Sequence, residues 1–223
     1  MDVSDAVAQR RSVRAFLETP VERDVLRELL ALAARAPSGG NLQPWRVFVV
    51  DGDALARLKA KMAERLRTKP SPDLPPEYDI YPSPLAEPYR SERYAVGEAM
   101  YAQLGIPRED RAARLQWFSS NYRLFGAPCA LFCYVDRGMG PPQWADLGMF
   151  LQTLMLLLAE RGLASCAQEA WSLYHREVAA ITDAPDEWRL FCGMAIGHAD
   201  PQAPVNALRS RRLPFEQYAR FVD

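Results

Sequence analysis

The chain has 223 residues, with 27 basic and 28 acidic side chains and a net charge of -1, a balance typical of a folded globular protein. This charge gives no electrostatic reason to expect nucleic acid or an anionic membrane as partner. The longest apolar stretch, Met149 to Ala159, is too short to span a bilayer. The first residues have neither the basic segment nor the apolar run of a signal peptide, so we expect a cytoplasmic protein.

Hydrophobic periodicity and helix-start signals predict alternating helices and strands. Thr19 and Glu22 form a capping-box pair with Pro20 at the first helical position, and Asp53 is expected to cap a later helix. Helices are predicted near 3–9, 20–33, 53–66, 95–104, 108–119, 143–161 and 173–182, and strands near 46–51, 129–135 and 189–196. The pattern indicates an α/β or α+β layered fold.

The stretch from Lys69 to Pro88 differs sharply from its surroundings. It holds seven of the eighteen prolines together with several tyrosines. Regular structure is not expected there, and a long ordered excursion or lid is the natural interpretation.

The predicted helix 143–161 is apolar nearly all round, and a subunit interface is one way to bury such a helix. The tail from Asn206 is rich in arginine and closes with Phe215, Tyr218 and Phe221. An aromatic tail of this kind suits the same interface.

Metal chemistry and a Ser/His/Asp triad are both poorly supported. A zinc site needs paired close spacings with histidine nearby, but His175 and His198 stand apart from any cysteine cluster. Buried reduced thiols are expected at Cys129, Cys133, Cys166 and Cys192.

Phosphate binding must rest on side chains, because the chain has neither a glycine-rich Rossmann turn nor a phosphate loop. In an extended segment Arg10, Ser12 and Arg14 would project to one face, and Arg11 adds a further cation. Guanidinium groups bind phosphate oxygens in pairs, so this face suits a phosphate dianion. The alternative is a solvated basic stretch after a surface helix.

The loop from Ala36 to Trp45 combines small residues with Asn41 and Gln43. Small residues let a flat ligand approach the backbone, while the amides supply donors and acceptors. Trp45 is expected in the core. Taken as a generic turn, the loop would carry no function.

These two motifs together resemble the nitroreductase family of FMN-dependent oxidoreductases, in its nitrobenzoate-reductase-like branch. Segments 121–128, 162–171, 191–197 and 206–214 extend the resemblance, in order, over nearly the whole chain. The resemblance implies an α+β three-layer α-β-α sandwich with a central, mostly antiparallel sheet. It further implies one domain over 1–223, with a Pro-rich lid at about 69–120 and a C-terminal arm at about 206–223, in an intertwined homodimer.

The resemblance also implies which residues contact FMN, from both subunits. Phosphate and ribityl groups would be held by Arg10, Arg11, Ser12 and Arg14. A second phosphate clamp would come from among Arg209, Arg211 and Arg212. The partner's isoalloxazine would lie along Pro37, Ser38, Gly39 and Asn41. The ribityl chain or pyrimidine edge would meet Asn121, with Arg123 as a further candidate. The ring near N5 would contact Gln168, Glu169 and Ala170.

By the same resemblance, NADH or NADPH would deliver hydride to flavin N5, and a small aromatic oxidant such as a nitroaromatic or quinone would then take it. This ping-pong scheme needs no catalytic side chain. Other flavin chemistry (flavin fragmentation, reductive dehalogenation or ring dehydrogenation) and a non-catalytic flavin-binding or anion-binding protein stay open as alternatives.

The lid supplies candidate substrate contacts. Tyr78 and Tyr81 would wall an aromatic substrate, and Arg90 or Arg93 would meet a carboxylate on it. The alternative is a loop packed on the body with solvated arginines. Two departures from the family pattern, Ala167 in place of a proline and the long Pro-rich stretch, leave the substrate open.

Overall fold

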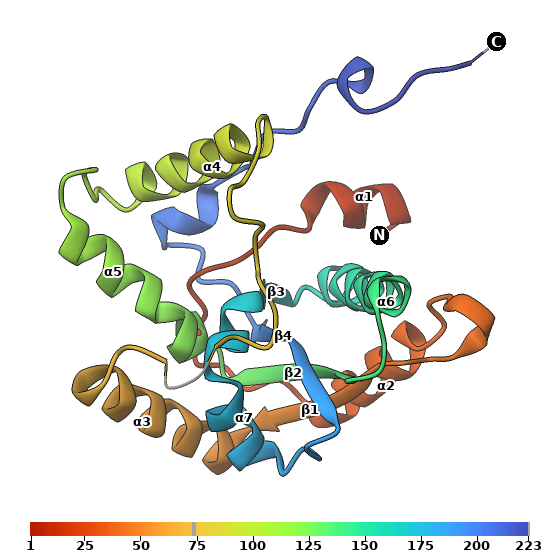
Figure 1. Cartoon of the computed structure of the whole chain (residues 1–223), viewed down its shortest axis with the longest axis horizontal. Coiled ribbons are helices and arrows are strands. Elements are labelled where there is room, and N and C mark those ends of the chain that lie inside the picture. The colour runs from red at the N-terminus through yellow and green to blue at the C-terminus, as the bar shows by residue number, and fades with distance from the viewer. Residues whose placement is uncertain (73–74, 223) are drawn as a thin grey trace.

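A four-stranded sheet forms the centre of the computed structural model, which describes residues 1–72 and 75–222 (Figure 1). Asp73 and Leu74 of the predicted lid and Asp223 of the predicted arm lie outside the described residues. The strand order is β1-β2-β4-β3, and each neighbouring pair is antiparallel. The strands are β1 (Arg46–Asp51), β2 (Cys129–Asp136), β3 (Ala164–Gln168) and β4 (Trp188–Gly197).

The two faces of the sheet bury two separate hydrophobic cores, and β2 shows why. Its even-numbered residues, such as Phe132, pack into one cluster, while its odd-numbered residues, such as Leu131, pack into the other. This sorting follows from the period-two alternation of side chains along a strand. Residues 129–135 are all buried, as expected for a central strand covered on both faces.

Helices cover both faces, which confirms the predicted three-layer α+β fold. Helices α2 (Arg23–Ala33) and α6 (Pro141–Glu160) pack on the face that holds Leu131. The other face is covered by α3 (Gly52–Thr68), α7 (His175–Thr182) and the 3-10 segments Ser120–Gly126 and Glu169–Tyr174. A short α1 (Val3–Gln9) lies beside α6 (Figure 1). Among the described residues, no helix has the length and apolar character that crossing a bilayer requires.

The predicted starts of α2 and α3 were wrong for one tertiary reason. Helix α2 begins at Arg23, with Glu22 as N-cap and no side-chain capping bond, so the Thr19–Glu22 capping box does not form. Asp51, not Asp53, is the N-cap of α3 and makes no capping bond either. Arg23 Nε donates to Asp51 Oδ2 at 2.8 Å. Because Arg23 occupies the carboxylate, this ion pair joins the starts of both helices in place of local caps.

Helices α4 (Tyr89–Gln103) and α5 (Arg111–Ser119) stand apart from the sheet (Figure 1). Neither helix has a buried residue. Helix α4 starts several residues earlier than predicted, directly after Pro88, which is the last proline of the Pro-rich stretch. The described residues between α3 and α4 form no helix or strand, as predicted. After a short 3-10 turn, Pro204–Ala207, the C-terminal segment extends away from the body and carries a second turn, Phe215–Gln217 (Figure 1).

Candidate functional site

The arginine-rich segment lies along the free edge of β3. Ser12 forms a parallel bridge with Ser165, and Val13 N donates to Ser165 O at 3.0 Å. Val13 is buried in the core. Because side chains alternate in an extended segment, Ser12 and Arg14 project away from the core. The predicted shared face of these residues therefore exists at this edge.

Asn206 fastens the C-terminal segment to this edge. Its Oδ1 accepts from Arg14 N at 2.9 Å, and its Nδ2 donates to Ala15 O at 2.8 Å and to Asp200 O at 2.9 Å. Arg11 Nε donates to Asn206 O at 3.0 Å. Asn206 is 6% exposed. Sequence reasoning saw Asn206 only as the first residue of a terminal motif and assigned it no contact.

A cavity of about 420 Å³, here called the arginine cavity, opens between these two segments. Five arginines line it together with two serines: Arg10, Arg11, Arg14, Arg209, Arg212, Ser12 and Ser210. Among the described residues no carboxylate lines it. Burial, and then the charge of Arg209, lower the pKa of Arg11. An uncompensated cluster of guanidinium groups favours a bound anion.

Arg211 points elsewhere. Its Nε donates to Glu92 Oε2 of α4 at 3.0 Å, and it lines a neighbouring cavity, here called the outer cavity, of about 520 Å³. The outer cavity is bounded by Tyr81 and residues 92–99 on one side and by residues 208–211 on the other. Of the three C-terminal arginines, the structure therefore brings Arg209 and Arg212 to the arginine cavity.

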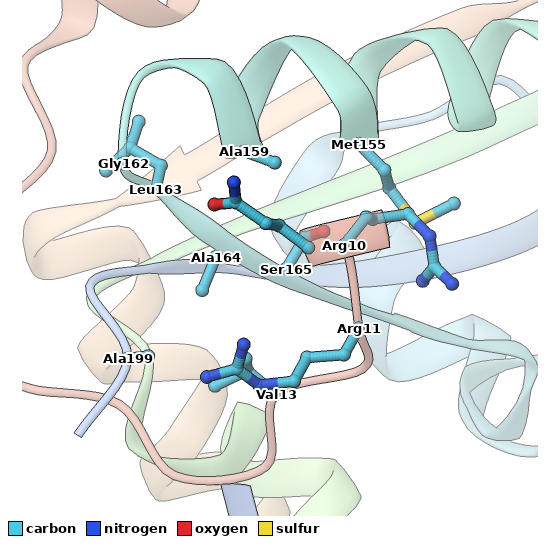
Figure 2. A pocket seen from close by; sticks show the side chains of 11 residues that line it. Arg10, Arg11, Val13, Met155, Ala159, Gly162, Leu163, Ala164, Ser165 and Ala199 are labelled. Atoms are coloured by element: carbon cyan, nitrogen blue, oxygen red, sulfur yellow. The ribbon is translucent and has the colours of Figure 1, made fainter. Parts of the chain in front are cut away.

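Arg10 and Arg11 also line a smaller cavity of about 170 Å³ on the other side of their segment, against Met155 and Ala159 of α6. Figure 2 shows the two arginine side chains leaving one stretch of backbone in different directions. Arg10 and Arg11 therefore contact both cavities, whereas Arg14 lines the arginine cavity and not the smaller one.

An aromatic cavity of about 410 Å³ adjoins the arginine cavity and shares Arg14 with it. The end of β3 and the residues after it, 167–170, form one side. Aromatic side chains of α4 and α5, including Tyr101, Trp117 and Phe118, form the other. Glu169 is the carboxylate that lines this cavity in the described chain, and burial raises its pKa.

Gln168 links the two sides of the aromatic cavity. Its Nε2 donates to Asn121 O at 2.8 Å and to Asn121 Oδ1 at 3.2 Å. Asn121 Nδ2 in turn donates to Phe118 O at 2.8 Å. Gln168 is 3% exposed, and its Oε1 has no partner within the part of the chain described. A buried acceptor is costly to leave unpaired, so this atom invites a donor from a ligand.

The loop at residues 37–43 lies against α6, away from the lining of both cavities. Gly39 N donates to the two carboxylate oxygens of Asp146 on α6 at 3.3 and 3.4 Å, and Gln43 N donates to Ser38 Oγ at 2.9 Å. Asp146 is buried. Neither the arginine cavity nor the aromatic cavity has a lining residue from this loop. Within one chain, Pro37, Ser38, Gly39 and Asn41 are therefore not brought to the other predicted contacts.

Two of the four predicted substrate residues reach the aromatic cavity. Tyr81 and Arg93 line it, and the Arg93 Cζ lies 4.1 Å from the centroid of the Tyr81 ring.

The other two lie outside it. Tyr78 donates its hydroxyl to Phe191 O and packs against Trp144, with ring centroids 5.2 Å apart. Arg90 pairs with Glu87 at 2.6 Å and is exposed. Neither residue lines the arginine, aromatic or outer cavity.

The described residues contain no group of three or more side chains suited to hold a metal. All four cysteines are buried free thiols, as predicted. Burial raises the pKa of Cys129 and of Cys192 to about 12, so these thiols are protonated and unreactive at neutral pH.

The nitroreductase family model matches residues 7–198. The chain is 35% identical to a nitrobenzene nitroreductase of Ectopseudomonas oleovorans and 35% identical to a 4-nitrobenzoate reductase of Pseudomonas putida. Each alignment covers 99% of this chain and 96% of the relative. The chain belongs to the nitroreductase family, which confirms the resemblance.

Solved structures agree. An FMN- and NADPH-dependent nitroreductase, NfnB from Sphigopyxis sp. strain HMH, superposes with a TM-score of 0.95 at 49% identity, covering 100% of both chains. The FMN-dependent nitroreductase NfnB from Mycobacterium smegmatis, solved in complex with NADPH, gives a TM-score of 0.92 at 29% identity over 100% of both chains. The similarity therefore spans α4, α5 and the C-terminal segment as well as the sheet.

Proposed function

We propose that the protein is an FMN-dependent oxidoreductase that transfers reducing equivalents from NADH or NADPH to a nitroaromatic or quinone. The observation that carries this proposal is the junction of the two cavities at Arg14. Guanidinium groups, with no carboxylate among the described residues beside them, adjoin an aromatic-lined cavity. This arrangement matches a molecule with a phosphate dianion at one end and a planar ring at the other. The cofactors named for the NfnB relatives support the same conclusion.

The residues present fit FMN. The phosphate would lie in the arginine cavity beside Arg14, Arg209 and Arg212, with Arg10, Arg11 and Ser12 at its edge. The buried Gln168 Oε1, which lacks a donor among the described residues, would accept from an N–H or O–H of the ring or ribityl chain. Asn121 would meet the same part of the cofactor, and Glu169 and Ala170 would contact the ring edge.

When bound, FMN supplies the hydride acceptor and donor at its N5 atom, which allows a ping-pong exchange between donor and oxidant. The chain's own residues bind and orient. Arginine charge near the phosphate and the amide groups of Gln168 and Asn121 near the ring would set the electrostatic environment of the site. The aromatic side chains of α4 and α5 would restrict the access of water to the ring. No side chain needs to act as nucleophile.

The homodimer is part of the proposal. Several large apolar side chains are exposed on the body: Val7 of α1, Met149 of α6, and Leu42 of the loop before β1. In the C-terminal segment the exposed ones are Phe215, Tyr218 and Phe221. A second copy would cover them. The loop at 37–43, which reaches neither cavity of its own chain, would then contact the flavin of the partner subunit. Asp146 would hold Gly39 in place for that contact.

The stretch at about 69–120 is proposed to act as a lid on a single domain, and 206–223 as an arm. Tyr81, Arg93 and the aromatic residues of α4 and α5 would shape substrate choice. The relatives named above act on neutral and on acidic nitroaromatics, so they do not decide between the two.

The test uses freshly purified protein. It should be yellow, release about one FMN per chain on denaturation, and sediment as a dimer at micromolar concentration. Anaerobic NADH or NADPH should bleach it, and nitrobenzene, 4-nitrobenzoate or a quinone should restore the colour. Recovery of FAD, or no flavin binding after incubation with FMN, would contradict the cofactor. Bleaching without recovery by these oxidants would favour other flavin chemistry, and a flavin-loaded monomer would contradict the assembly.

A further inference from the structure

The two arginines at the start of α4 differ in their surroundings. Arg90 has a carboxylate partner, Glu87, whose oxygen lies 2.6 Å from its guanidinium group. Arg93 has no carboxylate partner among the described residues, and its guanidinium group lies over the Tyr81 ring, 4.1 Å from the centroid. Arg93 lines both the aromatic and the outer cavity, whereas Arg90 lines neither.

Stacking on Tyr81 prepares Arg93 to bind an anion. A guanidinium group that lies on a ring keeps its in-plane N–H donors free for a carboxylate or phosphate. The ring also restricts the long side chain before a ligand arrives, which lowers the entropy cost of binding. The same geometry is unavailable to an ammonium group.

The segment that carries Tyr81 is itself fixed to the body. Glu77 accepts a pair of hydrogen bonds from Arg137 at 2.7 and 2.8 Å, and Tyr78 donates to Phe191 O. Tyr81 follows three residues later. The Arg93–Tyr81 stack therefore rests on an anchored stretch of the Pro-rich segment.

The charges around Arg93 do not neutralise it. Glu92 faces the outer cavity but is engaged by Arg211. Glu169 also lines the aromatic cavity, where burial raises its pKa, and it forms no ion pair with Arg93 within the described residues. Arg14, the other cation of the aromatic cavity, is assigned to the cofactor in the proposed function. Among the described residues that line the aromatic cavity, Arg93 is thus the cation left to meet a second ligand.

We propose that Arg93, held on the Tyr81 ring, recognises an anionic oxygen group on the aromatic molecule that enters the cavity, so that the protein prefers acidic ligands over neutral ones of the same shape. This inference rests on the proposed function, since the cavity is taken as the place of donor and oxidant. The anionic group has two possible sources: a carboxylate on a nitroaromatic oxidant, or the ribose phosphate that distinguishes NADPH from NADH.

The experiment measures binding to the oxidised, FMN-loaded protein by calorimetry, so that turnover is not the readout. Two matched pairs of probes are used: benzoate against benzamide, and NADP⁺ against NAD⁺. The variants are Arg93→Ala, Arg93→Lys and, as the matched control on the same helix, Arg90→Ala. Flavin content and the unfolding curve of each variant establish that it is folded and loaded.

Arg93→Ala should weaken binding of the anionic member of one pair by about tenfold and its neutral or unphosphorylated counterpart by less than about twofold. Selective loss of benzoate identifies the oxidant as the source of the anion, and selective loss of NADP⁺ identifies the donor. Arg93→Lys should recover only part of the loss because it keeps the charge but not the stack. Arg90→Ala should leave both pairs unchanged.

The inference is overturned if Arg93→Ala changes neither affinity ratio, benzoate to benzamide or NADP⁺ to NAD⁺. It is also overturned if Arg90→Ala changes a ratio as much as Arg93→Ala does, because the effect would then come from the overall positive charge of α4. These outcomes are separate from failure of the proposed function. A protein that binds no FMN, or that NAD(P)H does not reduce, fails before any ratio is measured.

Discussion

The two sides of the site are built by different means. On the body side, residues 10–16 and β3 are joined through main-chain hydrogen bonds, and the buried Asn206 joins the start of the C-terminal segment to them. On the lid side, α4 and α5 bury no residue completely. They are tied to each other by Arg114 and Glu98, and to the C-terminal segment by Arg211 and Glu92. One side is built like a core and the other like a surface.

This difference has an energetic consequence. Breaking a buried hydrogen bond costs about 1–3 kcal/mol, because the remaining group stays unpaired, whereas ion pairs that stay open to solvent contribute less. Segments held by few buried contacts open locally at low cost. The body side therefore suits permanent binding of a cofactor, and the lid side suits the exchange of two successive ligands.

The largest effect is expected from Asn206→Leu. This change removes the three hydrogen bonds that the Asn206 side chain makes to the backbone of Arg14, Ala15 and Asp200. It should lower the free energy of unfolding by roughly 3 kcal/mol. FMN binding should fall with it, because the backbone at Arg14 loses its hydrogen bond to the Asn206 side chain. Urea unfolding and flavin titration measure the two effects. The control is Gln202→Ala, an exposed residue in the turn just before this 3-10 segment. A loss in the control as large as that in Asn206→Leu would contradict the role assigned to Asn206.

The second prediction concerns Arg14→Ala. A charge-assisted hydrogen bond to phosphate is worth roughly 1.5–3 kcal/mol, so FMN affinity should fall about tenfold to a hundredfold. Arg211→Ala is the control, because Arg211 pairs with Glu92 outside the arginine cavity. Flavin titration should show a clear difference between the two variants. Equal affinities for Arg14→Ala and the parent would remove Arg14 from the cofactor site.

Sequence periodicity predicted most elements of the sheet and the helices that bury residues. The strand predicted at 189–196 is β4 (Trp188–Gly197), and Ser12 and Arg14, which flank the buried Val13, do share a face. These successes have one cause: a two-residue or 3.6-residue period is a local property that burial then enforces. The start of α2 could not be predicted in this way, because a contact with Asp51, 28 residues from Arg23, replaces the local cap.

The site was predictable only where a motif marks it. Which C-terminal arginines reach the arginine cavity depends on Glu92, 119 residues from Arg211, and no local pattern encodes that pairing. Tyr78 and Tyr81 look alike in a stretch without periodicity, yet one packs on Trp144 and the other lines the cavity. Asp146 and Asn206 act on backbone groups of distant segments and leave no signature in their own neighbourhoods.

The third prediction tests the lid side. Arg114 binds Glu98 through two hydrogen bonds, at 2.5 and 3.0 Å, and stacks on Tyr101. Glu98→Gln should leave FMN affinity and the urea midpoint unchanged, while hydrogen exchange becomes faster in α4 and α5. The matched control is Glu64→Gln, which breaks the exposed Arg67–Glu64 pair on α3. If Glu98→Gln weakens FMN binding, the two sides of the site are not independent as described.

The smallest effect is expected where the two sides meet, at Glu169. Burial raises the pKa of this carboxyl group above its ordinary value of 4.5. Between that value and the raised one, the folded protein holds a proton that the unfolded chain has released, so stability falls as pH rises through this window. Glu169→Gln should remove this dependence: the variant should match the parent at pH 4 and exceed it above the window. The gain should stay below about 1 kcal/mol, because the carboxyl group reaches solvent through the cavity.

Urea unfolding of the flavin-free protein across this pH range measures the gain, with Glu216→Gln on the exposed C-terminal segment as control. A parallel pH profile for parent and Glu169→Gln would mean that Glu169 ionises in the folded protein as it does in water, and the carboxylate would then repel the anionic ligands that Arg93 is proposed to attract.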